Sequence, residues 1–95
     1  MDLSPDERKR SILEYVRSMP RRTVGLPTQY NKVNVIIMIA EDMLGELSSL
    51  WKSGDITRGE VDYIEEEFFR VLTKLWKDKV ITKRVYSEIT NKFTK

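Results

Sequence analysis

Residues 50–58 read LWKSGDITR, and residues 75–83, 25 positions later, read LWKDKVITK. Between residues 50–64 and 75–89, six of fifteen positions are identical, and Arg58 is matched by Lys83. In each copy a Leu-Trp pair closes a helical pattern and a short polar loop follows. An Ile-Thr pair then precedes the next helical pattern, because Thr is a preferred N-cap. The repeat therefore predicts consecutive helices joined by two similar short loops.

Helices are predicted on both sides of each loop. Apolar residues at three- and four-residue spacing, Leu44 among them, predict a core-facing helix over residues 29–53, with Gly54 as its left-handed terminator. The next helix, over residues 58–77, follows Thr57 and Glu60, whose spacing is that of a capping box. A last helix is predicted over residues 83–93.

The first helix is predicted over residues 5–18, because Ser4 and Pro5 are typical of a helix start. Pro20 disfavours helix at the residue before it, so residues 19–30 are predicted to be a connector without regular structure. No segment alternates long enough to be a strand. The fold class predicted is all-α: one domain, residues 1–95, forming a four-helix bundle with antiparallel neighbours.

Two groups of apolar residues have more than one interpretation. Val35, Met38 and Ile39 lie off the main apolar stripe of their helix, which indicates either a helix buried centrally in its own bundle or a homodimer contact. Trp51 and Trp76 occupy matching places in the repeat. We expect both to be structural caps over the bundle ends, with an interface role as the alternative.

Composition excludes several classes of function. The chain has no Cys and no His, so it lacks a thiolate nucleophile and the commonest general base and metal ligand. Asp62 and Glu66 share a helix face and could hold a weakly bound cation, but a solvated acidic face is the favoured interpretation. We expect no catalytic residues, no metal and no cofactor, and hence no enzyme.

The expected location is the cytoplasm. The longest apolar run, residues 35–40, is far shorter than the roughly 20 residues that a membrane-spanning helix needs. Residues 1–7 also lack the basic and apolar regions of a signal peptide.

Charge is segregated along the chain, with net charges of +3 for residues 1–32, −6 for residues 33–73 and +5 for residues 74–95. Such blocks suit either a bundle whose outer helices complement its centre or basic patches presented to a partner. The Arg-rich first block is the predicted contact for an acidic protein or phosphate, since guanidinium groups suit both. Its residues are Arg8, Arg10, Arg17, Arg21 and Arg22, with Tyr15 and Tyr30 beside them. The alternative is a solvated face on which Glu14 bridges Arg10 and Arg17.

The last helix offers a second interpretation, a DNA-binding regulator of the helix-turn-helix kind. Its outward side would carry the base-contacting residues. These are Lys83, Arg84, Ser87, Asn91 and Lys92. Against this, the same loop recurs at residues 53–57 before a strongly acidic helix that would repel phosphate.

Residues 54–60, GDITRGE, resemble the G-x-I-T-x-x-E opening of short C-terminal helical modules of many bacterial proteins. In size, helical pattern and charge-rich composition with a single Gln, the whole chain resembles small accessory subunits of crenarchaeal B-family DNA polymerases. That resemblance implies a non-catalytic subunit that binds a DNA polymerase and contacts the DNA backbone. The composition itself, rich in Lys, Glu and Ile and poor in Gln and Cys, indicates an origin in a hot environment. A small plasmid or virus protein fits the composition equally. We therefore expect a non-enzymatic accessory or adaptor subunit of a DNA replication complex.

Overall fold

The computed structural model describes residues 3–94, so residues 1–2 and 95 lie outside the description. Within that range the chain forms only helices and their connections, which confirms the all-α prediction. None of the helices in residues 3–94 is both long and apolar enough to cross a membrane. The helices are α1 (Pro5–Arg17), α2 (Met19–Thr23), α3 (Gln29–Lys52), α4 (Arg58–Lys77) and α5 (Lys83–Phe93).

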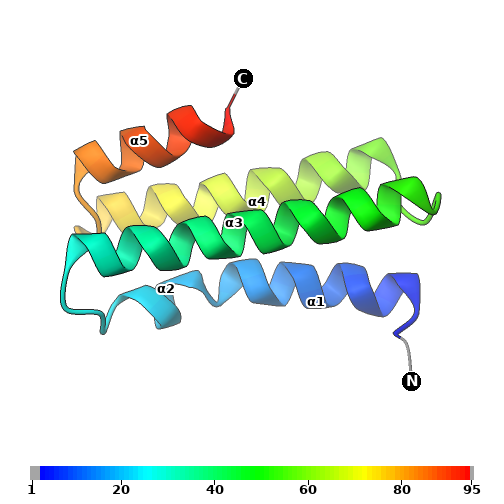
Figure 1. Ribbon diagram of the computed structural model, residues 1–95, viewed down its shortest axis with the longest axis horizontal. Helices are drawn as coiled ribbons and strands as arrows, with labels where there is room; N and C mark the ends of the chain where they lie inside the picture. The colour runs from blue at the N-terminus through cyan, green and yellow to red at the C-terminus, as the bar shows by residue number, and fades with distance from the viewer. Residues whose placement is uncertain (1–2, 95) are drawn as a thin grey trace.

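The helices α3 and α4 are antiparallel and form the centre of the molecule (Figure 1). The helices α1 and α2 pack against both of them on one side, and α5 packs against both on the other. The Cα atoms span 38 × 30 × 17 Å, and the shortest dimension is that of two packed helix layers. This arrangement buries α3 on two sides and leaves the α3–α4 pair uncovered wherever α5 does not reach.

Four helices begin with side-chain caps, three of them at the residues predicted and the fourth, that of α3, at Thr28. In each, a hydroxyl accepts a hydrogen bond from the backbone N–H three residues later, which satisfies a donor that has no partner within the helix. The capping box of α4 is complete, because Glu60 also accepts from the backbone N–H of Thr57 at 3.0 Å. The cap residues are Ser4, Thr28, Thr57 and Thr82.

The two repeated loops have the same backbone structure. In each, a left-handed residue donates to the carbonyl of the Trp, and the residue after it donates to the carbonyl of the Leu. This pair of bonds is the Schellman motif, which ends helices by satisfying their last carbonyls. The N···O distances are 3.1 and 2.9 Å in the first loop (Gly54 to Trp51, Asp55 to Leu50) and 3.0 and 2.9 Å in the second (Lys79 to Trp76, Val80 to Leu75).

The prediction that residues 19–30 lack regular structure was wrong for α2. Pro20 lies in the first turn of this short helix, where a missing N–H costs no hydrogen bond. Met19 and Thr23 are fully buried, and the Thr23 hydroxyl donates to the Met19 carbonyl at 2.8 Å. The bundle consequently contains five helices in residues 3–94 rather than four.

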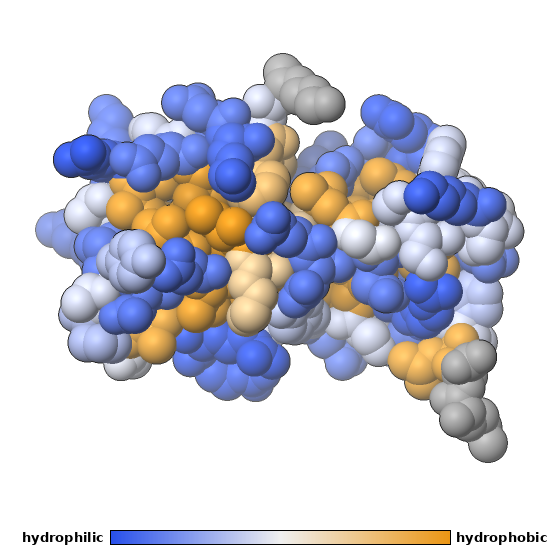
Figure 2. Space-filling model, in the orientation of Figure 1, coloured by the Kyte–Doolittle hydropathy of each residue, from blue (hydrophilic) through white to orange (hydrophobic). Residues whose placement is uncertain are grey.

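Two residues of α3 bear on the sequence predictions of burial. Ile39 is fully buried, so the first of its two interpretations, a helix buried centrally in its own bundle, holds for it. Leu44, predicted to face the core, is 37% exposed because it lies on the part of α3 that α5 does not cover. Figure 2 shows apolar surface over α3 between α2 and α5. Met38 is 45% exposed and Val35 is half-buried, so a homodimer through these two residues stays a prediction.

Candidate functional site

Polar side chains of α1 bind acidic residues of α3. The Arg8 guanidinium lies 3.0 Å from the Glu46 carboxylate. The Tyr15 hydroxyl donates to Asp42 at 2.7 Å. Burial raises the pKa of Tyr15, and its hydrogen bond to the Asp42 carboxylate raises that pKa further.

A second set of contacts joins α1 to α4. Lys9 Nζ lies 2.9 Å from the Glu60 carboxylate, and this hydrogen bond raises the pKa of Lys9. The pKa of Glu60 is lowered, first by the Thr57 backbone N–H and then by Lys9. Together with the α3 contacts, these show a basic α1 that complements the acidic centre of the bundle.

Glu67 is the buried acid of this interface. It is only 7% exposed and pairs with Arg70 on its own helix and with Arg17 Nε at 3.2 Å. The hydrogen bond from Arg70, and then that from Arg17, holds the pKa of Glu67 below its ordinary value. Arg17 Nη2 also lies 3.4 Å from the Tyr63 hydroxyl.

The structure does not bring the five predicted arginines together on one surface. Arg8 and Arg17 are nine residues apart, which at 100° per residue places them on opposite sides of α1. Each is bound to a different helix, so the idea of one shared anionic surface was wrong for this pair. The predicted Glu14 bridge is also absent among the described residues, since Arg17 pairs with Glu67 instead.

The other members of that predicted site vary in accessibility. Arg10 and Arg21 are exposed, and Tyr30 is 74% exposed. Tyr15 is half-buried. The Arg22 guanidinium lies 5.2 Å from the centre of the Tyr15 ring, and its Nε donates to Ser18 Oγ at 2.7 Å.

Basic residues from both predicted regions meet at one end of the bundle. This end contains α2, the start of α3, the end of α4 and the start of α5 (Figure 1). Gln29 joins two of these parts, because its amide donates to Val80 O and accepts from the Thr82 N–H, both at 3.1 Å. The bases of residues 19–32 and 77–87, which we call the basic end, are Arg21, Arg22, Lys32, Lys77, Lys79, Lys83 and Arg84.

The basic end contains little compensating negative charge. Residues 19–32 and 77–87 include one acid, Asp78, which lies 3.4 Å from Lys74. Arg84 pairs with Glu88 at 3.3 Å, while no ion pair involves Lys77, Lys79 or Lys83 within residues 3–94. Lysines without such pairs remain free to bind an external anion.

The residues of the alternative DNA site lie on the outward face of α5, where all five are exposed: Lys83, Arg84, Ser87, Asn91 and Lys92. The helix itself folds back along α4. Tyr86 is 2.9 Å from the Thr73 hydroxyl, and the rings of Phe93 and Phe68 are 6.2 Å apart, so the two helices run antiparallel. A helix-turn-helix pair instead crosses at a wide angle.

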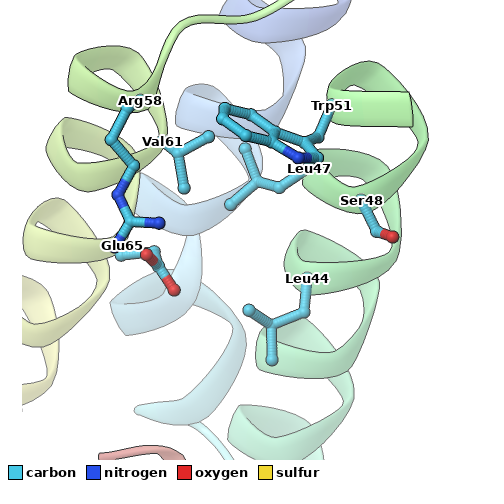
Figure 3. A pocket seen from close by; sticks show the side chains of 7 residues that line it. All are labelled: Leu44, Leu47, Ser48, Trp51, Arg58, Val61 and Glu65. Atoms are coloured by element: carbon cyan, nitrogen blue, oxygen red, sulfur yellow. The ribbon is translucent and has the colours of Figure 1, made fainter. Parts of the chain in front are cut away.

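An open groove lies between α3 and α4 beyond the end of α5 (Figure 3). Its volume is about 370 Å³. Apolar side chains from both helices line it, together with one acid and one base. The groove residues are Leu44, Leu47, Ser48 and Trp51 from α3, and Arg58, Val61 and Glu65 from α4. Figure 3 shows the Trp51 indole above Leu47, reaching towards Val61.

The two tryptophans have different environments despite their matching backbones. Trp76 is half-buried and stacks on Tyr86, with ring centres 4.9 Å apart. Trp51 is 53% exposed, so the prediction that it caps the bundle was wrong. In the repeat, Tyr86 aligns with Val61, whose smaller side chain cannot cover Trp51 in the same way. The groove was not predicted from the sequence. The replacement of Tyr by Val between the two repeat copies was the signal that could have indicated it.

No group of three or more His, Cys, Asp or Glu side chains that could hold a metal occurs in residues 3–94. Asp62, considered above as a weak cation ligand, pairs with Arg58 at 3.3 Å.

Comparison with family models, curated proteins and solved structures found no match to this chain.

Proposed function

We propose that this protein is a non-enzymatic helical adaptor, an accessory subunit of a nucleic-acid-processing complex, which contacts the nucleic-acid backbone through its basic end. The observation that carries this proposal is the convergence of basic residues from four segments on one end of the bundle. Arg21, Lys32, Lys77 and Lys83 come from different helices and meet only in the folded chain.

The chemistry of the basic end favours phosphate as its ligand. Lys and Arg neutralise phosphates and release counterions, which is the main source of sequence-independent affinity for nucleic acid. Tyr30 stands at the start of α3 beside these bases with 74% of its surface exposed. An exposed aromatic ring next to a basic surface offers a platform on which an unpaired base can stack.

An adaptor role is favoured over a sequence-reading regulator by the position of α5. Because α5 lies antiparallel on α4, it does not project as a recognition helix does. Contacts to phosphate fix position and orientation but carry no sequence information directly. The proposed complex is one of DNA replication, with a polymerase as the protein partner that the resemblance suggests.

Fluorescence anisotropy with two unrelated labelled 20-base-pair DNA duplexes and one single strand tests the nucleic-acid contact. At about 100 mM salt, the double change Arg21→Glu with Lys83→Glu should weaken binding at least tenfold. Wild-type affinity should fall with salt at a log–log slope of about −0.9 per contacted duplex phosphate. The two duplexes should bind with equal affinity.

The matched control is Arg10→Glu with Lys52→Glu, which changes the net charge equally at two exposed residues outside the basic end. This variant should lose less than about threefold in affinity. An equal loss in both variants would mean that the net charge of the protein, and not the basic end, determines the affinity for nucleic acid. Failure of the wild type to bind any of the three probes at low salt would refute the nucleic-acid contact.

A further inference from the structure

We infer that the open groove between α3 and α4 binds a basic amphipathic helix of a partner protein. This inference rests on the proposed adaptor function and deepens it, because it gives the chemistry of the protein partner. It is independent of the nucleic-acid contact, since the groove residues and the basic end share no residue.

The groove continues the path that α5 already occupies. At 1.5 Å per residue, α3 is about 36 Å long, α4 about 30 Å and α5 only about 16 Å. Where α5 ends, Phe93 and Thr94 line a hollow that shares Glu65 with the open groove. One half of the α3–α4 surface is thus covered by a helix of this chain, and the remaining half has room for two to three further helical turns.

The apolar floor of the groove lacks an aromatic neighbour that the second repeat copy possesses. There, the Tyr86 ring of α5 stacks on Trp76. In the first copy the matching residue is Val61, and the Trp51 indole is half-exposed beside it. A side chain from outside the chain can take the place that Tyr86 occupies in the second copy. The partner helix is therefore expected to carry a large apolar or aromatic residue at its centre.

Acidic side chains near the groove determine the charge of the partner. Glu65 lines the groove and Glu66 lines the adjoining hollow, while Glu41 is exposed one turn before Leu44. None of these three carboxylates forms an ion pair within residues 3–94, in contrast to Glu46, Glu60 and Glu67 elsewhere in the bundle. Arg58, the base of the groove, is paired with Asp62. The unpaired carboxylates therefore favour Lys and Arg on the flanks of the bound helix.

A display library of 14-residue peptides, selected against the wild-type protein, tests both properties. The selected binders should have apolar residues at i, i+3, i+4 and i+7, an excess of Lys and Arg, and helical circular dichroism when bound. Two groove variants should weaken them at least tenfold. Val61→Tyr fills the space beside Trp51 with the residue that the second copy already accommodates, and Glu65→Lys reverses one charge. Thermal melts near wild type would show that both variants fold.

Met38→Ser is the matched control, because Met38 is a similarly exposed apolar residue of α3 outside the groove. It should leave peptide affinity within about twofold. Binders that are acidic, or that both groove variants retain, would overturn the inference, as would a selection without any binder. A wild-type dimer that Trp51→Ser dissociates in sedimentation equilibrium would show that a second copy occupies the groove instead.

The DNA measurements separate this inference from the proposed function. Val61→Tyr should leave DNA affinity unchanged, and the basic-end variant should retain peptide binding. If the wild type binds DNA but no peptide, the groove inference is refuted and the proposed function stands. If it binds peptide but no DNA, the nucleic-acid contact is refuted and the groove inference stands.

Discussion

Gly54 and Lys79 hold the same left-handed backbone position at the ends of α3 and α4, with φ angles of 75° and 63°. Glycine adopts this conformation freely, whereas a residue with a Cβ is less stable there by about 1–2 kcal/mol. The second loop thus keeps the Schellman hydrogen bonds of the first at a conformational cost that the first avoids.

Replacing Lys79 by Gly should therefore stabilise the protein. We expect a gain of about 1 kcal/mol in the free energy of unfolding, measured by urea denaturation. The conformational strain that the change relieves in the folded state is larger than the entropy that glycine adds to the unfolded chain. The reciprocal control is Gly54→Ala, which should destabilise by about the same amount. Apart from the adjoining residues of the chain, no atom lies within 4 Å of the added Cβ at Gly54, so that loss would reflect backbone conformation alone. A neutral Lys79→Gly would show that the left-handed conformation costs little here.

The two tryptophans should respond differently to truncation. Trp76→Ala removes the ring that stacks on Tyr86 and should destabilise by about 3 kcal/mol, towards the lower end of aromatic core truncations because Trp76 is only half-buried. Trp51→Ala should cost less than about 1 kcal/mol, since more than half of its surface is already exposed. Thermal melts and urea titrations of both variants provide the comparison. Equal losses would mean that the Trp51 side chain is buried in solution.

The arginines of the first predicted site should divide into structural and surface residues. Arg17→Glu places a carboxylate beside the buried Glu67 and removes one of its hydrogen bonds, so it should destabilise by at least about 1.5 kcal/mol. Arg21→Glu makes the same charge change at an exposed residue of α2 and should stay within about 0.5 kcal/mol of wild type. Urea titration at neutral pH measures both. If Arg17→Glu were as harmless as Arg21→Glu, the Arg17–Glu67 contact between α1 and α4 would contribute nothing to stability.

Acid should weaken the fold partly through Glu67. Its pKa is lower in the folded state than the ordinary value of 4.5. Its ionised form therefore stabilises the fold fully above pH 4.5, and that contribution is lost as the pH falls through the folded-state pKa. Glu67→Gln should be less stable at pH 7 and should lose less stability than wild type between pH 5 and 3. Urea midpoints across this range measure the difference, and Glu60, whose pKa is also lowered, should account for part of the slope that remains. Parallel slopes in the two proteins would contradict this assignment.

The long helices could be predicted from sequence because their signals are local. Caps at Ser4, Thr57 and Thr82 gave their starts, and Gly54 gave the end of α3 within one residue. The short α2 was missed because Pro20 was interpreted as a terminator, although proline also suits the first turn of a helix.

Exposure was harder to predict than secondary structure, because it depends on which helix lies over a residue. Leu44 and Trp51 have the same periodicity as core residues, and they are exposed because α5 ends before reaching them. The partners of Arg8 and Arg17 likewise depend on how α1 lies between α3 and α4. Neither property is encoded in local spacing. The basic end could not be predicted either, since its residues come together only through the antiparallel chain path.

The separation of charge between the two ends has a further consequence for how the molecule approaches a partner. Residues 41–66, around the loop opposite the basic end, contain eight acidic residues and two basic ones. The protein therefore has a permanent electric dipole along its longest dimension. In the field of a polyanion such a body experiences a torque and turns its positive pole inward before collision. If the basic end binds nucleic acid as proposed, a molecule oriented in this way approaches it with the groove directed outwards to solution, and the two proposed ligands do not compete for space.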